Sequence, residues 1–319
     1  MCESLEVYKL QGLKDWKIGK LEDWKIGEQR LPILPTKFFP FFRPSNFFLS
    51  CFCDFVPLVI LLAGLLFGCN PSDQTQQQRR ELQRDALKLR MGQALNPTDA
   101  EGHIQLGNVY RELGEYEKAI ESFQNAIALD DRHPHAYNNL GLVYTDTRMF
   151  ALAIEMFLAA LELSPGNPAF YNNLGYAYDL TDQFEEALDA FHNALESEPT
   201  FVDAYYNLAD AYLHREMYQD AIKSYEAGLE IEEGDADVYF NLGLAYEENE
   251  EFLSAIQSYE KGLSLDDSDA EAYYRLAQAY QKNGDPLMMR RYLEIFLERA
   301  EGLPHLEEQV RTAEQLVDK

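Results

Sequence analysis

The chain of 319 residues has few cysteines, and all of them lie near its start. They are Cys2, Cys51, Cys53 and Cys69. No cysteine occurs in the 250 residues that follow Cys69. That long remainder therefore has neither a disulfide framework nor a cysteine-based metal site.

Basic residues are also scarce. Lys and Arg number 27 against 55 Asp and Glu, which makes the formal net charge −28. The imbalance falls after Cys69, where 19 basic residues stand against 48 acidic ones. Such a surface repels nucleic-acid phosphates and anionic lipid, so we expect no nucleic-acid partner and no binding of the body to anionic lipid.

Motifs typical of enzymes are missing as well. The chain has no glycine-rich phosphate loop, no G-x-S-x-G elbow and no H-E-x-x-H helix. His133 and His135 stand two residues apart near a predicted helix start, a spacing that does not suit a shared metal on one helix face. We expect no enzymatic activity, no cofactor, no metal site and no small-molecule substrate.

Residues 1–45 do not resemble a folded domain. They contain a tandem octapeptide, LKDWKIGK at Leu13–Lys20 followed by LEDWKIGE at Leu21–Glu28. Two copies of eight residues are too few to stack into a stable solenoid. We interpret 1–45 as an unstructured leader or the product of a start site assigned too far upstream, with a short docking peptide as the alternative.

Residues 46–69 are mostly apolar and end in Leu66-Phe67-Gly68-Cys69, which resembles the lipobox of bacterial lipoproteins. The uninterrupted apolar part, Leu58–Gly68, matches a signal-peptide core better than a spanning helix. The resemblance implies cleavage before Cys69, lipidation of Cys69, and attachment to the bacterial cell membrane or outer membrane with the repeats in the periplasm. A single transmembrane anchor over Phe47–Phe67 is the alternative.

A 34-residue period fills most of the remaining chain. It appears as Tyr137, Tyr171, Tyr205, Tyr239 and Tyr273, as a Leu series from Leu106 to Leu276, and as an Ala series from Ala119 to Ala255. Segments such as AYNNLGLVY, with this period, resemble the tetratricopeptide repeat. The resemblance implies an all-α, right-handed α-solenoid of stacked helix-turn-helix repeats.

The predicted organisation follows from that period. A polar tether covers 70–75, and a capping helix covers 76–99. Five full repeats cover 100–133, 134–167, 168–201, 202–235 and 236–269; a degenerate sixth covers 270–303. A capping helix over 304–319 closes the array with a polar outer face.

The sixth position of each repeat lies opposite the apolar stripe of its helix. It is occupied by Gln105, Asn139, Asn173, Asn207, Asn241 and Arg275. Side-chain amides donate and accept, so this row is suited to pair with the backbone of an extended peptide. It is similar to the asparagine ladder of O-linked N-acetylglucosamine transferases. A solvated row without a ligand is the alternative.

Acidic residues surround this row, and the principal ones are Asp203, Asp210, Asp237 and Glu248. They predict a basic or polar extended partner whose binding weakens as salt rises. Alternatively, they only keep a helical surface soluble. Tyr206, Phe240 and Tyr274, all at the fifth position, form an apolar patch that is either helix packing or an anchor pocket.

Together these features indicate a membrane-tethered scaffold that binds a protein or peptide partner through its concave groove. Bacterial envelope assembly, secretion or pilus biogenesis is the expected context. The alternatives are a cytoplasmic-side or transmembrane-anchored assembly chaperone that binds a client peptide, and a regulatory subunit of an enzyme acting on envelope polymers.

Overall fold

The computed structural model describes residues 71–317 of the chain. The chain forms two units, Met1–Cys69 and Asn70–Lys319, and all of the described residues belong to the second. The predictions for residues 1–45 and 46–69, including lipidation of Cys69, lie outside the described residues. Residues 71–317 contain helices and no strand, which confirms the all-α solenoid.

Six helix pairs follow a long first helix. The first helix is α2 (Pro71–Leu95) and the last elements are the 3-10 turn η2 (Pro304–Leu306) and α15 (Glu307–Val317). The pairs are α3 (Ala100–Glu112) with α4 (Tyr116–Leu129), α5 (Pro134–Asp146) with α6 (Phe150–Leu163), α7 (Pro168–Asp179) with α8 (Phe184–Ser197), α9 (Val202–His214) with α10 (Tyr218–Ile231), α11 (Ala236–Glu248) with α12 (Phe252–Leu265), and α13 (Ala270–Lys282) with α14 (Pro286–Arg299).

The first helix of each pair starts where its repeat starts. Pro134 and Pro168 occupy the first helical turn, where the missing N–H has no intrahelical acceptor to lose. At other starts an aspartate caps the helix: the side chains of Asp99, Asp235 and Asp269 accept backbone N–H groups. These local signals favour helix starts at these positions independently of tertiary packing.

Within a pair, an aromatic ring of the second helix packs directly on the backbone of the first. A Cβ atom on Gly107 would lie 2.6 Å from Cε1 of Phe123, and one on Gly141 would lie 2.6 Å from Cε1 of Phe157. Both rings are fully buried. A side chain there would force the ring to shift, so glycine is favoured at both positions.

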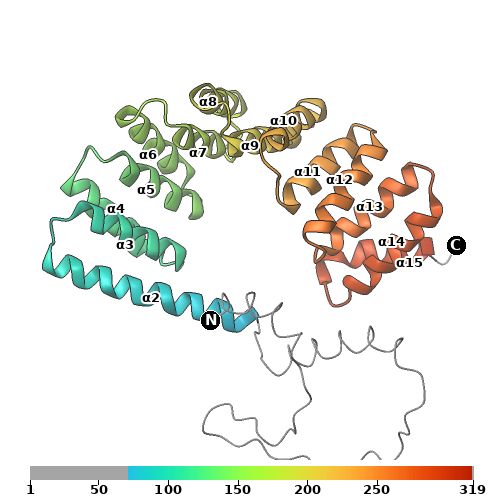
Figure 1. The fold of residues 1–319 in the computed structure, drawn as a ribbon, viewed down its shortest axis with the longest axis horizontal. Coiled ribbons are helices and arrows are strands. Elements are labelled where there is room, and N and C mark those ends of the chain that lie inside the picture. The colour runs from blue at the N-terminus through green and yellow to red at the C-terminus, as the bar shows by residue number, and fades with distance from the viewer. Residues whose placement is uncertain (1–70, 318–319) are drawn as a thin grey trace, which may run out of the picture. The chain divides into compact units, whose positions relative to one another are not determined.

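Successive pairs stack side by side within the unit Asn70–Lys319, so its core runs from Ala86 to Ala313 through every pair. The pairs follow an arc in which the first helices lie on the inner side, as α7 and α9 show inside α8 and α10 (Figure 1). The inner helices therefore share one concave surface.

Both ends of the array are covered by helices. α2 packs on α3 through Ala86 and Leu89, and it begins at Pro71, ahead of the predicted start at residue 76. Residues 71–75, predicted as a tether, thus lie within α2. At the other end, Leu306 and Ala313 are buried against the last pair. None of the described helices is both long and apolar enough to cross a membrane.

Candidate functional site

A seam of side-chain amides connects the inner helices of neighbouring repeats. Asn139, Asn173, Asn207 and Asn241 each donate from Nδ2 to the preceding repeat, across 2.9–3.1 Å. The acceptors are Oδ1 atoms of Asn108, Asn138, Asn172 and Asp210, respectively. The predicted asparagine row therefore exists, and part of its hydrogen-bonding capacity joins the repeats to one another.

The same amides keep capacity for a ligand. Each Nδ2 carries two hydrogens, and the seam uses one of them. Oδ1 of Asn173, Asn207 and Asn241 accepts no hydrogen bond from the residues that the structure describes. Oδ1 of Asn139 differs, because it accepts from Asn138 at 3.1 Å. A peptide backbone would meet one donor and one acceptor at most of these positions.

The two ends of the sixth-position row do not take part in the seam. Gln105 donates to Glu101 within α3, across 3.1 Å, and is exposed. Arg275 forms a 2.9 Å ion pair with Glu271 within α13. The row that bridges repeats is therefore limited to the four asparagines.

Asp210 lies deeper than its predicted groove position implies. It is half-buried, and its Oδ1 accepts from Asn241 and from the hydroxyl of Tyr225. Burial raises the pKa of the Asp210 carboxyl, although the hydrogen bond from Tyr225 acts in the opposite direction. Asp210 thus holds α9, α10 and α11 together in addition to facing the groove.

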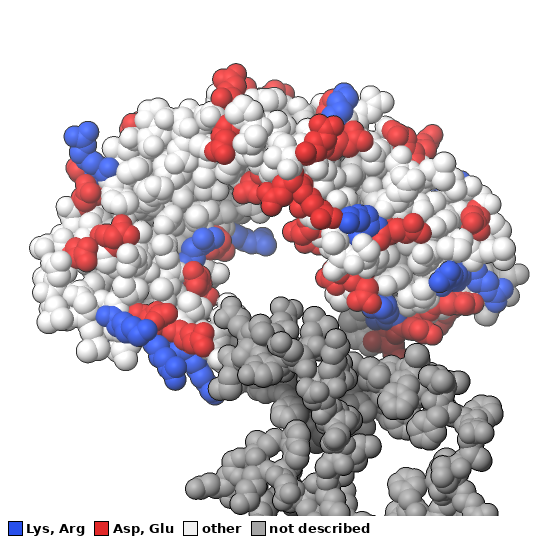
Figure 2. Space-filling view, in the orientation of Figure 1, with Lys and Arg blue, Asp and Glu red and all other residues white. Residues whose placement is uncertain are grey.

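The other predicted acids are available to a partner. Asp203, Asp237 and Glu248 are exposed, and none of them forms an ion pair or a side-chain hydrogen bond with another described residue. Acidic side chains gather along the inner edge of the array near α9 and α11 (Figure 2). This part of the concave surface carries uncompensated negative charge.

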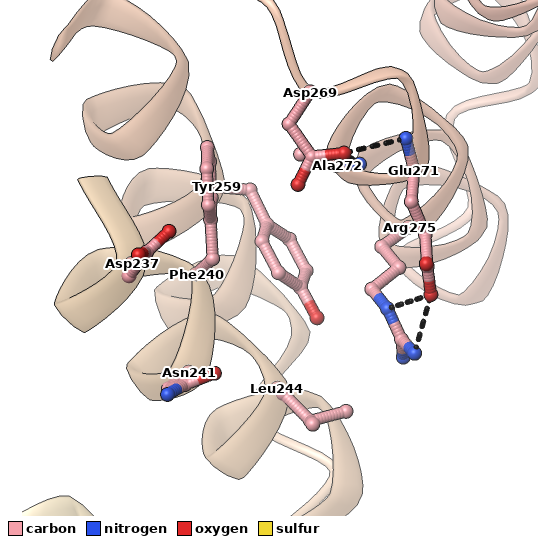
Figure 3. Close-up of a pocket in the computed structure, with 9 residues that line it drawn as sticks. All are labelled: Asp237, Phe240, Asn241, Leu244, Tyr259, Asp269, Glu271, Ala272 and Arg275. Carbon is pink, nitrogen blue, oxygen red and sulfur yellow. Dashed lines mark hydrogen bonds and ion pairs between the residues drawn. The ribbon is translucent and has the colours of Figure 1, made fainter. Parts of the chain in front are cut away.

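A pocket opens between α11 and α13 on this acidic stretch, with a volume of about 360 Å³ (Figure 3). It brings together Asp237, Asn241 and Arg275, three of the predicted groove residues, and it adds Phe240, Leu244, Tyr259, Asp269, Glu271 and Ala272. Phe240, Leu244 and Tyr259 supply an apolar wall.

The charges around this pocket do not balance. Asp269 uses Oδ1 to accept the N–H groups of Glu271 and Ala272, which leaves Oδ2 for a ligand. Glu271 is neutralised by Arg275. The carboxylates of Asp237 and Asp269 therefore remain without a cationic partner among residues 71–317.

Glycine at the twenty-seventh position of a repeat leaves space for the aromatic ring at the fifth position of the same repeat. The first three repeats have Ala126, Ala160 and Ala194 there, whereas the fourth and fifth have Gly228 and Gly262. A Cβ on Gly262 would lie 2.4 Å from Cε1 of Phe240, and one on Gly228 would lie 2.4 Å from Cε1 of Tyr206. The rings therefore pack on the second helix of their own repeat.

Both interpretations of the fifth-position patch apply. Phe240 is half-buried against α12 and also lines the pocket. The same ring therefore packs between helices and offers an apolar surface to a ligand. Tyr274 packs against Phe296 of α14, with ring centroids 5.0 Å apart. Tyr206 donates its hydroxyl to the carbonyl of Glu232, across 3.0 Å.

The sequence prediction missed Tyr259, Leu244 and Asp269 as parts of the site. One signal was present: the twenty-fourth position is Phe in the first three repeats and Tyr in the next two, Tyr225 and Tyr259. A hydroxyl placed in a buried core position needs an acceptor, which points to a polar group facing it.

Residues 71–317 contain no group of three or more His, Cys, Asp or Glu side chains arranged to hold a metal ion. His133 lies 3.5 Å from Glu101, and its ring meets that of His135 edge to face. These histidines belong to the junction of the first two repeats.

Family models agree with the geometry of the helix pairs. A model described as TPR repeat matches residues 107–147 and 248–284. Models described as tetratricopeptide repeat match 134–167, 156–189, 181–242 and 270–301. The helix pairs are tetratricopeptide repeats. Such repeats bind protein or peptide partners, which makes the chain a scaffold for protein–protein interaction.

Solved structures with tetratricopeptide arrays share this fold. The Cut9–Hcn1 hetero-tetramer of the APC/C has a TM-score of 0.61 at 17% identity, over 74% of this chain and 46% of that one. This chain thus spans less than half of that relative. PilF of Pseudomonas aeruginosa has a TM-score of 0.59 at 22% identity, over 67% and 97%.

A third structure, the C-terminal part of a TPR repeat-containing protein from Cytophaga hutchinsonii, has a TM-score of 0.56 at 21% identity. It covers 66% of this chain and 84% of that one. Identities this low establish the fold alone. A search of curated proteins finds no match.

Proposed function

We propose that this protein is a membrane-tethered tetratricopeptide scaffold of the bacterial envelope, acting in assembly, secretion or pilus biogenesis. In this proposal the concave surface over α9, α11 and α13 captures an extended, basic segment of a protein partner. The observation that carries it is the acidic pocket between α11 and α13, next to amides that keep free hydrogen-bonding atoms.

The shape and chemistry of the surface suit an extended chain. A peptide of about ten extended residues spans roughly 33 Å, which is enough to cross several inner helices. Its backbone would meet the amides of Asn173, Asn207 and Asn241, while its basic side chains would meet Asp203 and Asp237. Backbone contacts supply affinity that does not depend on sequence, and the carboxylates supply preference for positive charge.

The tether is supported by the sequence that precedes the array. Leu66-Phe67-Gly68-Cys69 ends an apolar segment, and α2 begins two residues later at Pro71. Two or more acyl chains give lasting attachment where a single chain gives only transient binding. In this proposal lipidated Cys69 holds the array at the membrane surface.

The groove is tested by fluorescence anisotropy with labelled decapeptides in which arginine or glutamate alternates with glycine and serine. We expect the arginine peptide to bind and the glutamate peptide not to bind. The double change Asp203→Asn and Asp237→Asn should weaken binding about tenfold. Binding should also weaken steeply as salt rises, because exposed charges are screened.

The matched control removes the same charge from the outer helices. Glu155→Gln together with Asp189→Asn changes two exposed acids of α6 and α8 that have no partner among the described residues. This pair should leave the affinity nearly unchanged. Equal losses in both double variants, or equal binding of both peptides, would show that the net charge of the protein acts and the groove does not.

The tether is tested by the mass of the mature N-terminal peptide from bacterial membranes. A peptide that begins at an acylated Cys69 supports the lipoprotein. An unmodified Cys69 in an uncleaved chain would instead favour the transmembrane-anchored chaperone, with the groove on the other side of the membrane.

A further inference from the structure

α2 differs from every other described helix. It has 25 residues, whereas the repeat helices have 12 to 14. Residues 75–81 are all exposed. Leu82, Ala86, Leu89 and Gln93 form the face that is turned toward α3. The side chains on the opposite face of α2 are exposed.

That opposite face exposes large apolar side chains. Leu87 is 58% exposed, Met91 is 63% exposed and Leu95 is 89% exposed. They are spaced four residues apart and therefore lie on one face of the helix. A row of exposed apolar residues on a helix indicates a surface that is covered in use.

The same face is basic. Arg80, Arg84 and Lys88 share it, and Arg80 and Arg84 form no ion pair with another described residue. Glu81 and Asp85 lie to one side, where Asp85 pairs with Lys88 across 2.6 Å. Basic side chains gather along α2, in contrast to the acidic inner edge of the array (Figure 2).

We propose that this outer stripe of α2, formed by Arg80, Arg84, Leu87, Lys88, Met91 and Leu95, lies on the surface of an anionic phospholipid membrane. The cations contact lipid phosphates while the apolar side chains enter the boundary between headgroups and acyl chains. In this proposal α2 is the exception in a body that otherwise repels anionic lipid, since five of its 19 basic residues lie there.

Two features single out the membrane as the occupant. Two copies of this body, each with 19 basic and 48 acidic residues after Cys69, repel each other, which disfavours a second copy on the stripe. The apolar segment 46–69 ends directly before α2 and would bring the stripe to the bilayer. The inference rests on the proposed tether for this proximity and does not depend on the groove.

In this arrangement α2 orients the repeats as well as capping them. The stripe is on the side of α2 away from α3, so binding it to lipid leaves α3 and the later repeats above the membrane plane. The strongly acidic remainder is repelled by anionic lipid, which favours the same orientation. A single anchor at Cys69 would allow the array to rotate, whereas a second contact along α2 restricts it.

The test uses residues 70–319, because every core contact described above lies within this unit. Co-flotation is measured with vesicles of equal parts phosphatidylglycerol and phosphatidylcholine, and with phosphatidylcholine alone. We expect binding to the anionic vesicles only. Arg80→Gln with Arg84→Gln, and separately Leu87→Gln with Met91→Gln, should each reduce partitioning about tenfold.

A matched control removes two arginines elsewhere. Arg132→Gln with Arg148→Gln changes one exposed residue of the first repeat and one of the second, and should leave flotation unchanged. Circular dichroism of each variant verifies that the helices persist. Absence of flotation with anionic vesicles, or an equal loss in the control pair, would overturn the proposal.

Two further outcomes would assign the stripe to another ligand, and either would overturn the membrane proposal. One is dimerisation without lipid, seen by sedimentation equilibrium and abolished by Leu87→Gln with Met91→Gln. The other is binding of soluble glycerophosphoglycerol as strong as binding to vesicles. Because the fragment lacks Cys69, a failure here differs from a failure of the tether, which the mature N-terminal mass reports.

Discussion

The hydroxyl of Tyr259 donates to Oε2 of Glu247 across 2.9 Å, and both side chains are buried. Glu247 is only 4% exposed, and its other oxygen accepts from Lys282 across 3.0 Å. Burial, followed by the charge of Glu247, raises the pKa of the Tyr259 hydroxyl, so that it stays a donor. Where this repeat has Tyr259 in place of the Phe of the first three repeats, a buried carboxylate accepts the added hydroxyl.

We predict that Tyr259→Phe lowers the free energy of unfolding by about 1–3 kcal/mol, because it leaves one oxygen of a buried carboxylate without a donor. Tyr246→Phe is the matched control, since Tyr246 donates to the exposed Glu226. It should cost under about 0.5 kcal/mol. Urea unfolding of both variants measures the difference, and similar costs would contradict the buried role of the pair.

Asp210 makes stability depend on pH. Its folded-state pKa is raised above the ordinary value of 3.8, so the folded state holds the proton more tightly than the unfolded chain. The stability from this group is therefore fully present below 3.8 and is lost as pH rises through the folded-state pKa. Relative to Asp210→Asn, the wild type should gain stability as the pH falls through that window.

The measurement is the difference in thermal midpoint between wild type and Asp210→Asn across the acidic range. Asp203→Asn serves as control, since Asp203 is exposed and forms no ion pair or side-chain hydrogen bond with another described residue. A wild-type advantage that grows with rising pH would mean that the hydrogen bonds from Tyr225 and Asn241 outweigh burial.

Gly262→Ala should destabilise the fifth repeat by about 1–3 kcal/mol, because the new methyl group occupies the space of the Phe240 ring. Gly92→Ala provides the contrast. Gly92 lies in α2 with nothing within 4 Å of an added Cβ, so alanine should stabilise by about 0.5–1 kcal/mol through helix propensity alone. Thermal unfolding of the two variants should shift in opposite directions.

A neutral result for Gly262→Ala would show that Phe240 leaves its packed position easily. The double change Gly262→Ala with Phe240→Leu distinguishes the cases, since a smaller side chain at residue 240 should recover part of the loss.

Asn207→Ala should lower the free energy of unfolding by about 1–2 kcal/mol. Asn172, which is 7% exposed, would lose the donor to its Oδ1. Gln105→Ala is the comparison, because Gln105 is exposed and bonds only within its own helix; it should be nearly neutral. Equal effects would mean that the seam contributes nothing to the array.

This seam bears on how the groove is tested. Alanine at the row of asparagines would weaken the array and the ligand contacts together, so lost binding could not be assigned to either. Exposed acids such as Asp203 and Asp237 carry no described interaction within the array and are the cleaner positions.

Local chemistry in the sequence determined the helix pairs, their 34-residue period and their starts. Pro134 and Pro168 suit the first helical position because their missing N–H is not needed there, and a buried stripe repeats because each pair must cover its neighbour. For the same reason the acidic character of the inner surface and the sixth-position asparagine row could be read without coordinates.

Only the tertiary structure decided what those residues contact. Asn207 and Asn172 are 35 residues apart, and whether an amide meets a peptide or the preceding repeat depends on how closely two inner helices approach. The pocket likewise needs three helices, since Phe240, Tyr259 and Asp269 meet only after stacking. Periodicity sets which face a side chain occupies, whereas the distance between stacked repeats sets its partner.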